Sequence, residues 1–197
     1  MLSTLKPVAE RTLQPIAKLL KHVNPNALTM LGLVFQVLFF VFVVNEMYAW
    51  ALVALILNAA DMLDGMVARS QGRVTAFGGF LDSTVDRFAD FTVLAAFAFA
   101  GLVGWEVVAP LIMLTYLISY IRSRTELAAK GKLVASVGLV ERTERFIIIF
   151  LGLLVYAIWP DALIFGHNLA VATLVLLAAL SLITVFQRVM FAYRKLQ

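Results

Sequence analysis

The sequence predicts an all-α integral membrane protein, in which an N-terminal amphipathic interfacial helix precedes six transmembrane helices. Of the 197 residues, 62% are hydrophobic and only 14% are charged, whereas soluble domains are nearer half apolar. The mean hydropathy of +0.95 fits several segments of the roughly 20 apolar residues that cross a bilayer. We expect a single domain over residues 1–197, with residues 1–24 as the N-terminal helix and 25–197 as the six-helix bundle.

The elements follow from the hydrophobic pattern. Residues 3–22 carry apolar side chains at roughly helical spacing with charged residues between them, which predicts a helix that lies in the membrane interface or supports the bundle by packing on it. Asn24-Pro25-Asn26 ends this helix and starts the first span. The expected spans cover residues 27–44, 48–69, 77–103, 107–126, 141–159 and 169–193, and residues 160–168 are expected to form a loop.

Lysine and arginine lie almost entirely in alternate connections between the spans. They precede the first span, separate the second from the third, surround the fourth-to-fifth connection and follow the sixth, while the connections near Asn45, Gly104 and Pro160 contain none. By the positive-inside rule, we expect a multi-pass protein of the cell (plasma) membrane with both termini in the cytoplasm. The same distribution explains the net charge of +4 without a nucleic-acid partner.

Four aspartates interrupt two of the apolar segments. Asp61 and Asp64 are three residues apart and Asp82 and Asp86 are four apart, so each pair shares one face of its helix. The short connection makes the two spans antiparallel neighbours, and at about 1.5 Å per residue both pairs reach a similar depth, roughly 8–13 Å below the cytoplasmic end. We therefore expect the four carboxylates to meet in one pocket that opens to the cytoplasm.

Such a cluster needs cations or protons to offset its mutual repulsion. The chain has no cysteine, and neither of its two histidines is near the aspartates in sequence. A metal site here would be all-oxygen, which suits Mg²⁺, Mn²⁺ or Ca²⁺, and Mg²⁺ often completes its shell with substrate phosphate. Carboxylates within spans also serve ion or proton transporters, or tie helices together. The spacing favours metal-dependent catalysis and leaves transport and a structural polar cluster as alternatives.

Small residues accompany the aspartates. Gly65 directly follows Asp64, Ala68 comes three residues later, and Gly78 precedes Asp82 by four. Small side chains let a ligand or another helix approach the backbone closely. Arg69, one turn beyond Gly65, is placed to pair with a phosphate.

Taken together, residues 61–86 follow the pattern Asp-x2-Asp-Gly-x2-Ala-Arg-x8-Gly-x3-Asp-x3-Asp. This resembles the signature of the CDP-alcohol phosphatidyltransferases, a family of six-helix membrane enzymes with an N-terminal amphipathic helix that is often dimeric. The resemblance implies that a CDP-linked lipid donates its phosphatidyl-type group to an alcohol and releases CMP. It also makes membrane lipids and a second copy of the chain expected partners.

The resemblance assigns roles to individual residues. It implies that Asp61, Asp64, Asp82 and Asp86 hold two divalent ions, Mg²⁺ or alternatively Mn²⁺. Asp86 would also act as the general base on the acceptor hydroxyl, whereas Asp90 is expected to pair with an arginine, with Arg87 neutralising this region. The residues expected to contact the CDP-linked lipid are Asn26, Ala27, Leu28, Thr29, Asp61, Gly65, Ala68, Arg69, Thr75 and Gly78.

Two segments, 118–126 and 138–145, indicate which acceptor the enzyme would use. They resemble the family members that use inositol phosphate, which are the phosphatidylinositol-phosphate synthases of actinobacteria and the archaetidylinositol-phosphate synthases of archaea. The positions that match the acceptor-phosphate pocket of that subgroup are Ser119, Arg122, Arg142, Arg145 and Arg188.

The chain departs from that subgroup at several of these positions. Arg122 stands where lysine is expected, Thr143 where proline is expected, and residues 130–137 have no clear counterpart. The expected acceptor is a phosphorylated polyol, first inositol phosphate, with glycerol 3-phosphate or another alcohol as the alternative. The arginines would otherwise orient the chain or contact lipid headgroups.

Overall fold

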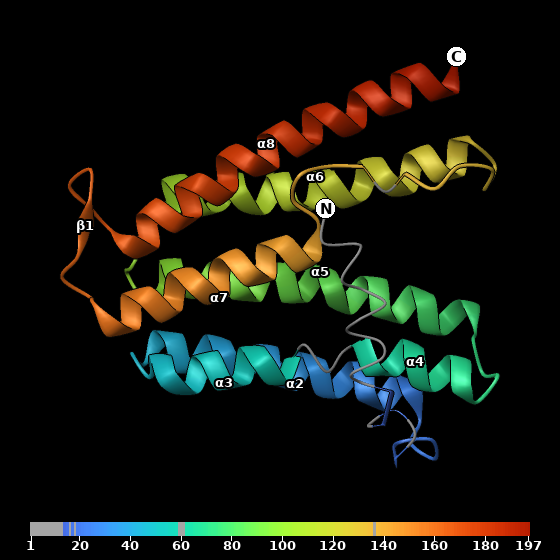
Figure 1. The fold of residues 1–197 in the computed structure, drawn as a ribbon, viewed down its shortest axis with the longest axis horizontal. Coiled ribbons are helices and arrows are strands. Elements are labelled where there is room, and N and C mark those ends of the chain that lie inside the picture. The colour runs from blue at the N-terminus through green and yellow to red at the C-terminus, as the bar shows by residue number, and fades with distance from the viewer. Residues whose placement is uncertain (1–13, 16, 18, 59–61, 136) are drawn as a thin grey trace. The chain divides into compact units, whose positions relative to one another are not determined.

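The computed structural model describes residues 14, 15, 17, 19–58, 62–135 and 137–197 (Figure 1). Its helices and strands are α2 (Pro25–Val44), α3 (Tyr48–Asn58), α4 (Met62–Ser70), α5 (Ala76–Phe99), α6 (Trp105–Ala128), α7 (Arg142–Ile158), β1 (Leu163–Ile164), β2 (His167–Asn168) and α8 (Leu169–Leu196). The chain forms two compact units, Met1–Ala96 and Phe97–Gln197, and the boundary falls near the end of α5. The single domain expected from the sequence stays a prediction.

The first unit is organised around α2. This helix begins at Pro25, and the Asn24 side chain accepts a hydrogen bond of 3.0 Å from the backbone N–H of Asn26, as a helix-capping asparagine does. A short turn through Asn45 and Glu46, the latter with φ of 59°, returns the chain into α3. The helix α2 packs against both α3 and α4, so its N-terminal half lies beside the aspartate-bearing α4.

The N-terminal segment is fixed on α4 where the structure describes it. Buried Ala17 packs with Leu63 and Val67 of α4, and the Gln71 side chain donates hydrogen bonds to the backbone oxygens of Lys21 (2.7 Å) and Val23 (2.9 Å). Most of the amphipathic helix expected over residues 1–24 lies outside the described residues. The packing of this segment is therefore described only near its C-terminal end.

The second unit is built on α8, which packs against both α6 and α7 (Figure 1). The Asn168 side chain caps α8 by accepting a 2.8 Å hydrogen bond from Val171 and also donates one of 2.9 Å to the oxygen of Leu102. The α7–α8 contact is tight at Gly152, where an added Cβ would lie 2.4 Å from Cγ2 of Thr173. A small residue is thus required for the two helices to approach as they do.

A small hairpin occupies residues 163–168, within the segment 160–168 that the sequence predicts to be a loop. The strands β1 and β2 pair antiparallel, with Ile164 opposite His167. Phe165 and Gly166, between them, have φ angles of 52° and 79°. Two successive residues with positive φ are the mark of a two-residue type I′ hairpin turn. A phenylalanine at the first turn position gives little sequence signal for this turn, which explains why it was not expected.

Four helical segments in the described part of the chain are long and apolar enough to cross a membrane. They are Pro25–Val44, Trp105–Ala128, Leu169–Leu196 and the segment Tyr48–Ser70, of which the structure describes α3 and α4 on either side of residues 59–61. The protein is therefore a multi-pass, helical membrane protein, as expected. The two other long helices are not counted among these segments. The helix α5 contains four charged residues, and α7 has only 17 residues. The full count of six crossings stays a prediction.

The close α7–α8 contact makes a testable prediction. We expect Gly152→Ala to lower the melting temperature of the detergent-solubilised protein by several degrees, because overpacking a tight contact typically costs about 1–3 kcal/mol. Adding Thr173→Ala should restore part of this loss, since it removes two of the three atoms that the new Cβ meets. Thr173→Ala alone is the control, and an unchanged melting temperature in Gly152→Ala would contradict the packing described.

Candidate active site

A cavity of about 460 Å³ opens in the first unit, between the N-terminal end of α2, α4 and the start of α5. The residues predicted from the sequence that line it are Asn26, Thr29, Asp64, Gly65, Ala68, Arg69, Thr75, Gly78 and Asp82. Segments 24–29, 64–75 and 78–82 thus converge on one space. Of the other predicted donor contacts, Ala27 and Leu28 are not among the lining residues, and Leu28 packs against the cluster of Ala17, Leu63 and Val67.

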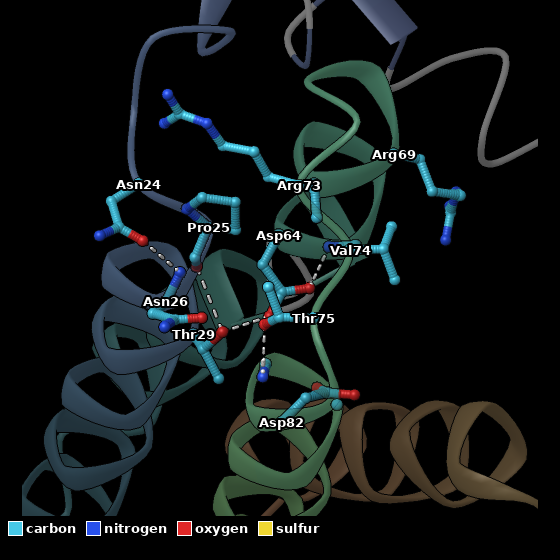
Figure 2. A pocket seen from close by; sticks show the side chains of 14 residues that line it. Asn24, Pro25, Asn26, Thr29, Asp64, Arg69, Arg73, Val74, Thr75 and Asp82 are labelled. Atoms are coloured by element: carbon cyan, nitrogen blue, oxygen red, sulfur yellow. Dashed lines mark hydrogen bonds between the residues drawn. The ribbon is translucent and has the colours of Figure 1, made fainter.

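The carboxylate of Asp64 forms the buried centre of this cavity. Its side chain is 8% exposed and accepts a 2.5 Å hydrogen bond from the hydroxyl of Thr29 on α2, together with one from the backbone N–H of Gly65. Figure 2 shows Thr29, Asp64 and Thr75 pointing toward one another, with Asp82 on α5 beside them. Hydrogen bonds to a carboxylate offset part of the cost of burying its charge, and here they also fix the direction of its oxygens.

Two glycines keep the cavity wall open. A Cβ at Gly78 would lie 3.1 Å from the hydroxyl oxygen of Thr75 and 3.5 Å from the side-chain oxygen of Asn26. The same Thr75 oxygen accepts a 3.0 Å hydrogen bond from the Gly78 N–H, so the start of α5 is fixed by this threonine. A Cβ at Gly65 would lie 3.4 Å from the Arg69 guanidinium. Side chains at these positions would crowd the groups that are expected to contact a ligand.

Two arginines give the cavity a cationic rim. Arg69 and Arg73 both line it, and in Figure 2 their guanidinium groups lie on opposite sides of the Asp64 carboxylate. The cavity therefore combines carboxylates at its centre with guanidinium groups at its edge. That combination suits a ligand that carries phosphates, since arginine pairs with phosphate oxygens in a planar, two-pronged geometry.

Asp86 lies one turn beyond Asp82 on α5 and is paired with arginine. The guanidinium of Arg87 lies 3.7 Å from the carboxylate of Asp86 and 3.5 Å from that of Asp90. The expected pairing of Asp90 with an arginine is therefore confirmed. One cation placed between two carboxylates lowers the local repulsion among the three aspartates of α5.

The donor atoms of the described residues are oxygens, which is the type of ligand that suits a hard divalent cation. Asp64 and Asp82 line one cavity with the side-chain oxygens of Asn26, Thr29 and Thr75, and oxygen ligands are what Mg²⁺ and Mn²⁺ prefer. Within the described residues, no group of three or more acidic, histidine or cysteine side chains is placed to hold a metal. Asp61, the remaining predicted ligand, lies outside the described residues, so the four-aspartate set stays a prediction.

The second unit gathers the arginines predicted to bind the acceptor. Arg188 of α8 is 4% exposed and donates to the backbone oxygens of Val137 and Ile118, each at 2.7 Å, and to the Glu141 carboxylate at 3.3 Å. It therefore ties α8 to α6 and to the segment that enters α7. Three of its five N–H groups are used in this way.

Further charges surround Arg188. Arg122 and Arg145 lie close enough to act on it electrostatically, as do Glu126 and Glu141, and Arg122 is bonded to Glu126 at 3.0 Å. The structure thus brings three of the predicted arginines together and adds two glutamates that balance them. Arg142 opens α7 and Ser119 lies next to Ile118 on α6, and their contact with an acceptor stays a prediction.

Some lining residues have no counterpart in the sequence prediction. In the first cavity these are Asn24, Pro25, Arg73, Val74 and Gly79. Most of them adjoin a predicted residue. Arg73 is a cation in the connection that follows α4, and this position in the sequence is the signal that could have identified it. Glu126 and Glu141 were missed because a counter-ion for a basic cluster has no sequence motif of its own.

Comparison with known proteins places these features in a family. Residues 22–191 match the family model for CDP-alcohol phosphatidyltransferase. The chain is 37% identical to the archaetidylinositol phosphate synthase of Pyrococcus horikoshii, over 100% of this chain and 99% of that protein. It is 37% identical to the phosphatidylinositol phosphate synthase of Mycobacterium tuberculosis, over 90% of this chain and 84% of that protein.

Solved structures of the Mycobacterium tuberculosis enzyme are also similar. The crystal structure with CDP-diacylglycerol bound has a TM-score of 0.76 and 27% identity, and the match covers 93% of this chain and 94% of that one. The crystal structure in complex with manganese and citrate has a TM-score of 0.75 at 27% identity, covering 91% and 88% of the two chains.

The hydrogen bond from Thr29 to Asp64 predicts a metal-affinity effect. Thr29→Val keeps the shape of the side chain but removes the donor. For the metal-ligand role that the sequence predicts for Asp64, loss of an orienting partner is expected to cost about 10–100-fold in affinity. Mn²⁺ binding to the purified protein, followed by electron paramagnetic resonance, measures the effect. Thr84→Val is the matched control, because the Thr84 hydroxyl bonds to the Phe80 oxygen of its own helix. Equal affinities in wild type and Thr29→Val would contradict an orienting role.

The contacts of Arg188 predict a stability effect. We expect Arg188→Gln to lower the melting temperature by several degrees, because buried oxygens lose their donors and hydrogen bonds to charged groups are worth about 1.5–3 kcal/mol each. Arg122→Gln, which removes an exposed ion pair, should change it little, since such pairs contribute about 0–1 kcal/mol. Thermal unfolding in detergent compares the two, and similar shifts would mean that Arg188 does not tie the helices together.

Proposed function

Because the chain belongs to the CDP-alcohol phosphatidyltransferase family, we propose that it is a phosphatidylinositol phosphate or archaetidylinositol phosphate synthase. It transfers the phosphatidyl-type group of a CDP-linked lipid to a hydroxyl of inositol phosphate and releases CMP. The observation that carries the proposal is the cavity in which Asp64, Asp82 and Arg69 of the family signature meet. The inositol-phosphate-using relatives that match along nearly the whole chain support the acceptor.

The cavity of the first unit binds the donor. Its arginine rim, Arg69 and Arg73, pairs with the pyrophosphate of the CDP-linked lipid. The glycines Gly65 and Gly78 let the nucleotide approach the backbone, and Asn26, Thr29 and Thr75 offer polar side chains to it. The Mycobacterium tuberculosis enzyme with CDP-diacylglycerol bound supports this class of donor.

The carboxylates Asp61, Asp64, Asp82 and Asp86 hold the divalent metal, Mg²⁺ with Mn²⁺ as the alternative, as two ions. When bound, such ions neutralise the charge that develops on the pyrophosphate. The manganese in a similar enzyme supports metal dependence. Thr29 and the Gly65 N–H contribute by holding the Asp64 oxygens in place before any ligand arrives.

Asp86 takes the proton from the acceptor hydroxyl. The oxygen then attacks the phosphorus on the lipid side of the pyrophosphate, and the bond from that phosphorus to the bridging oxygen breaks, so that CMP leaves. Arg87 keeps Asp86 in position through their ion pair, so that its carboxylate can act as the general base.

The basic cluster of the second unit binds the acceptor phosphate. Ser119, Arg122, Arg142 and Arg145 provide the donors, and Arg188 orders the segment that leads to Arg142 through its bonds to Val137 and Glu141. Glycerol 3-phosphate is the alternative acceptor, because it would need the same cations. Membership of the family supports transfer over the carboxylate-based transport that spacing alone left open.

The enzyme works in the cell (plasma) membrane. We propose six membrane crossings with both termini and the active site toward the cytoplasm, as the basic connections indicate, and the amphipathic segment 1–24 in the membrane interface. The chain acts as a single domain and forms a homodimer.

The reaction is tested by CMP release from purified protein with Mg²⁺. CDP-diacylglycerol and the ether-linked CDP-archaeol serve as donors in separate arms, and inositol phosphate, glycerol 3-phosphate, serine and free inositol as acceptors. We expect CMP with inositol phosphate well above the other acceptors. CMP release with glycerol 3-phosphate alone would contradict inositol phosphate as the acceptor. No CMP release with any of the four acceptors would contradict the proposed reaction.

The role of Asp86 predicts a separation of binding from chemistry. We expect Asp86→Asn to lower the transfer rate by about 10²–10⁴-fold, the usual contribution of a general base, while CDP-lipid binding is largely kept. Asp90→Asn removes the neighbouring carboxylate of the same helix and should cost at most a few-fold. Lost donor binding in Asp86→Asn, measured by calorimetry, would instead make Asp86 chiefly a metal ligand.

A further inference from the structure

A second cavity, outside both sites described above, opens beside the C-terminal end of α8. Its volume is about 730 Å³. It is lined by Val137, Gly138, Leu139, Phe186, Gln187, Met190, Phe191, Arg194 and Lys195. None of these residues belongs to the predicted donor or acceptor sets, and the cavity lies wholly within the second unit. We call it the α8 groove.

One wall of the α8 groove is the backbone of residues 137–139, which α8 holds firmly. The Gln187 side chain accepts a 3.1 Å hydrogen bond from the Leu139 N–H, and Arg188 donates to the Val137 oxygen. Gly138 has φ of 139°, and a Cβ there would lie 2.4 Å from Cγ2 of Thr184. Three successive residues of the connection are therefore fixed on one helix face, so the groove is a built feature and not a gap beside a loose loop.

The other wall combines apolar and basic side chains in a definite order along α8. Phe186 and Met190 are one turn apart, and Arg194 and Lys195 follow one turn later, with both cations exposed. The lining residues of the groove, all within the described part of the chain, include no aspartate or glutamate. The groove thus offers apolar contact at one end and positive charge at the other.

The length of α8 allows its basic end to reach the level of lipid headgroups. Its 28 residues span about 42 Å at 1.5 Å per residue, which exceeds the roughly 30 Å of the hydrocarbon core. The excess leaves about two turns outside the hydrocarbon, and the basic residues of a helix end are drawn to the interface. Arg194 and Lys195 are in the last turn of α8.

We propose that the α8 groove binds one anionic phospholipid, with the headgroup phosphate at Arg194 and Lys195 and an acyl chain along Phe186 and Met190. A phospholipid has the same order of charge and apolar surface as the groove. The net charge of the lipid matters, because a zwitterionic headgroup carries its own cation beside the phosphate and would gain less from two basic side chains. This site is independent of the proposed transfer reaction.

Native mass spectrometry of the purified full chain tests the proposal, with phosphatidylglycerol and phosphatidylcholine of equal chain length as competing ligands. We expect one phosphatidylglycerol to be retained in preference to phosphatidylcholine. The double variant Arg194→Gln/Lys195→Gln should lose roughly 25-fold in affinity for phosphatidylglycerol, since each basic residue near an anionic surface contributes on the order of fivefold. Arg124→Gln/Lys130→Gln removes two exposed cations outside the groove and should leave the preference unchanged.

Two further arms identify where and how the lipid is held. Phe186→Ser, at a side chain that is already 66% exposed, should weaken phosphatidylglycerol without preventing folding. Inorganic phosphate should not displace the lipid, whereas full displacement by phosphate would mean that the groove binds free anions and would overturn the proposal. Equal retention of the two lipids, or an unchanged preference in Arg194→Gln/Lys195→Gln, would also overturn it. Loss of the preference in Arg69→Gln/Arg73→Gln instead would place the lipid in the donor cavity.

Discussion

The burial of the Asp64 carboxylate is the constraint on which the first unit depends. A charged side chain in a membrane helix is costly, so it persists only with partners that compensate it. Here the hydroxyl of Thr29 and the N–H of Gly65 supply that compensation. Because Thr29 is on α2 and Asp64 on α4, this hydrogen bond fixes the two helices relative to each other beside the cavity. The same contact thus stabilises the fold locally and orients a carboxylate for the ligand.

In each unit, a local cluster of like charges includes a smaller number of opposite charges. In the first, Arg87 lies between Asp86 and Asp90. In the second, Glu126 and Glu141 act on the cluster around Arg188. Partial compensation lets like charges gather in a protein without unfolding it and leaves residual charge for a ligand of the opposite sign. Carboxylates suit metal and arginines suit phosphate, which is the division of tasks that a transfer between two phosphate-bearing substrates needs.

The sequence predicted most helices and most of the residues that line the first cavity, because both depend on local signals. Apolar runs ended by Asn24-Pro25 or Gly104 define the spans, and helical spacing brings Asp64 near Asp82 through a short connection. The hairpin at Phe165-Gly166 and the hydrogen bonds of Arg188 to two backbone oxygens and to the Glu141 carboxylate were not predictable in this way. The hairpin uses a turn residue with a weak preference for positive φ, and Arg188 acts on oxygens some 50 and 70 residues away in sequence. The sequence could place Arg188 in a basic cluster but could not predict its hydrogen-bond partners.

The most direct test of the account is where a divalent ion binds. Crystals of the protein grown with Mn²⁺ and a CDP-linked lipid would give an anomalous scattering peak at the manganese edge. We expect peaks within about 2.0–2.6 Å of carboxylate oxygens of Asp64 and Asp82, the usual range for hard cations and oxygen, with the pyrophosphate on the side of Arg69. Peaks elsewhere, or a bound nucleotide with no manganese at Asp64, would contradict it.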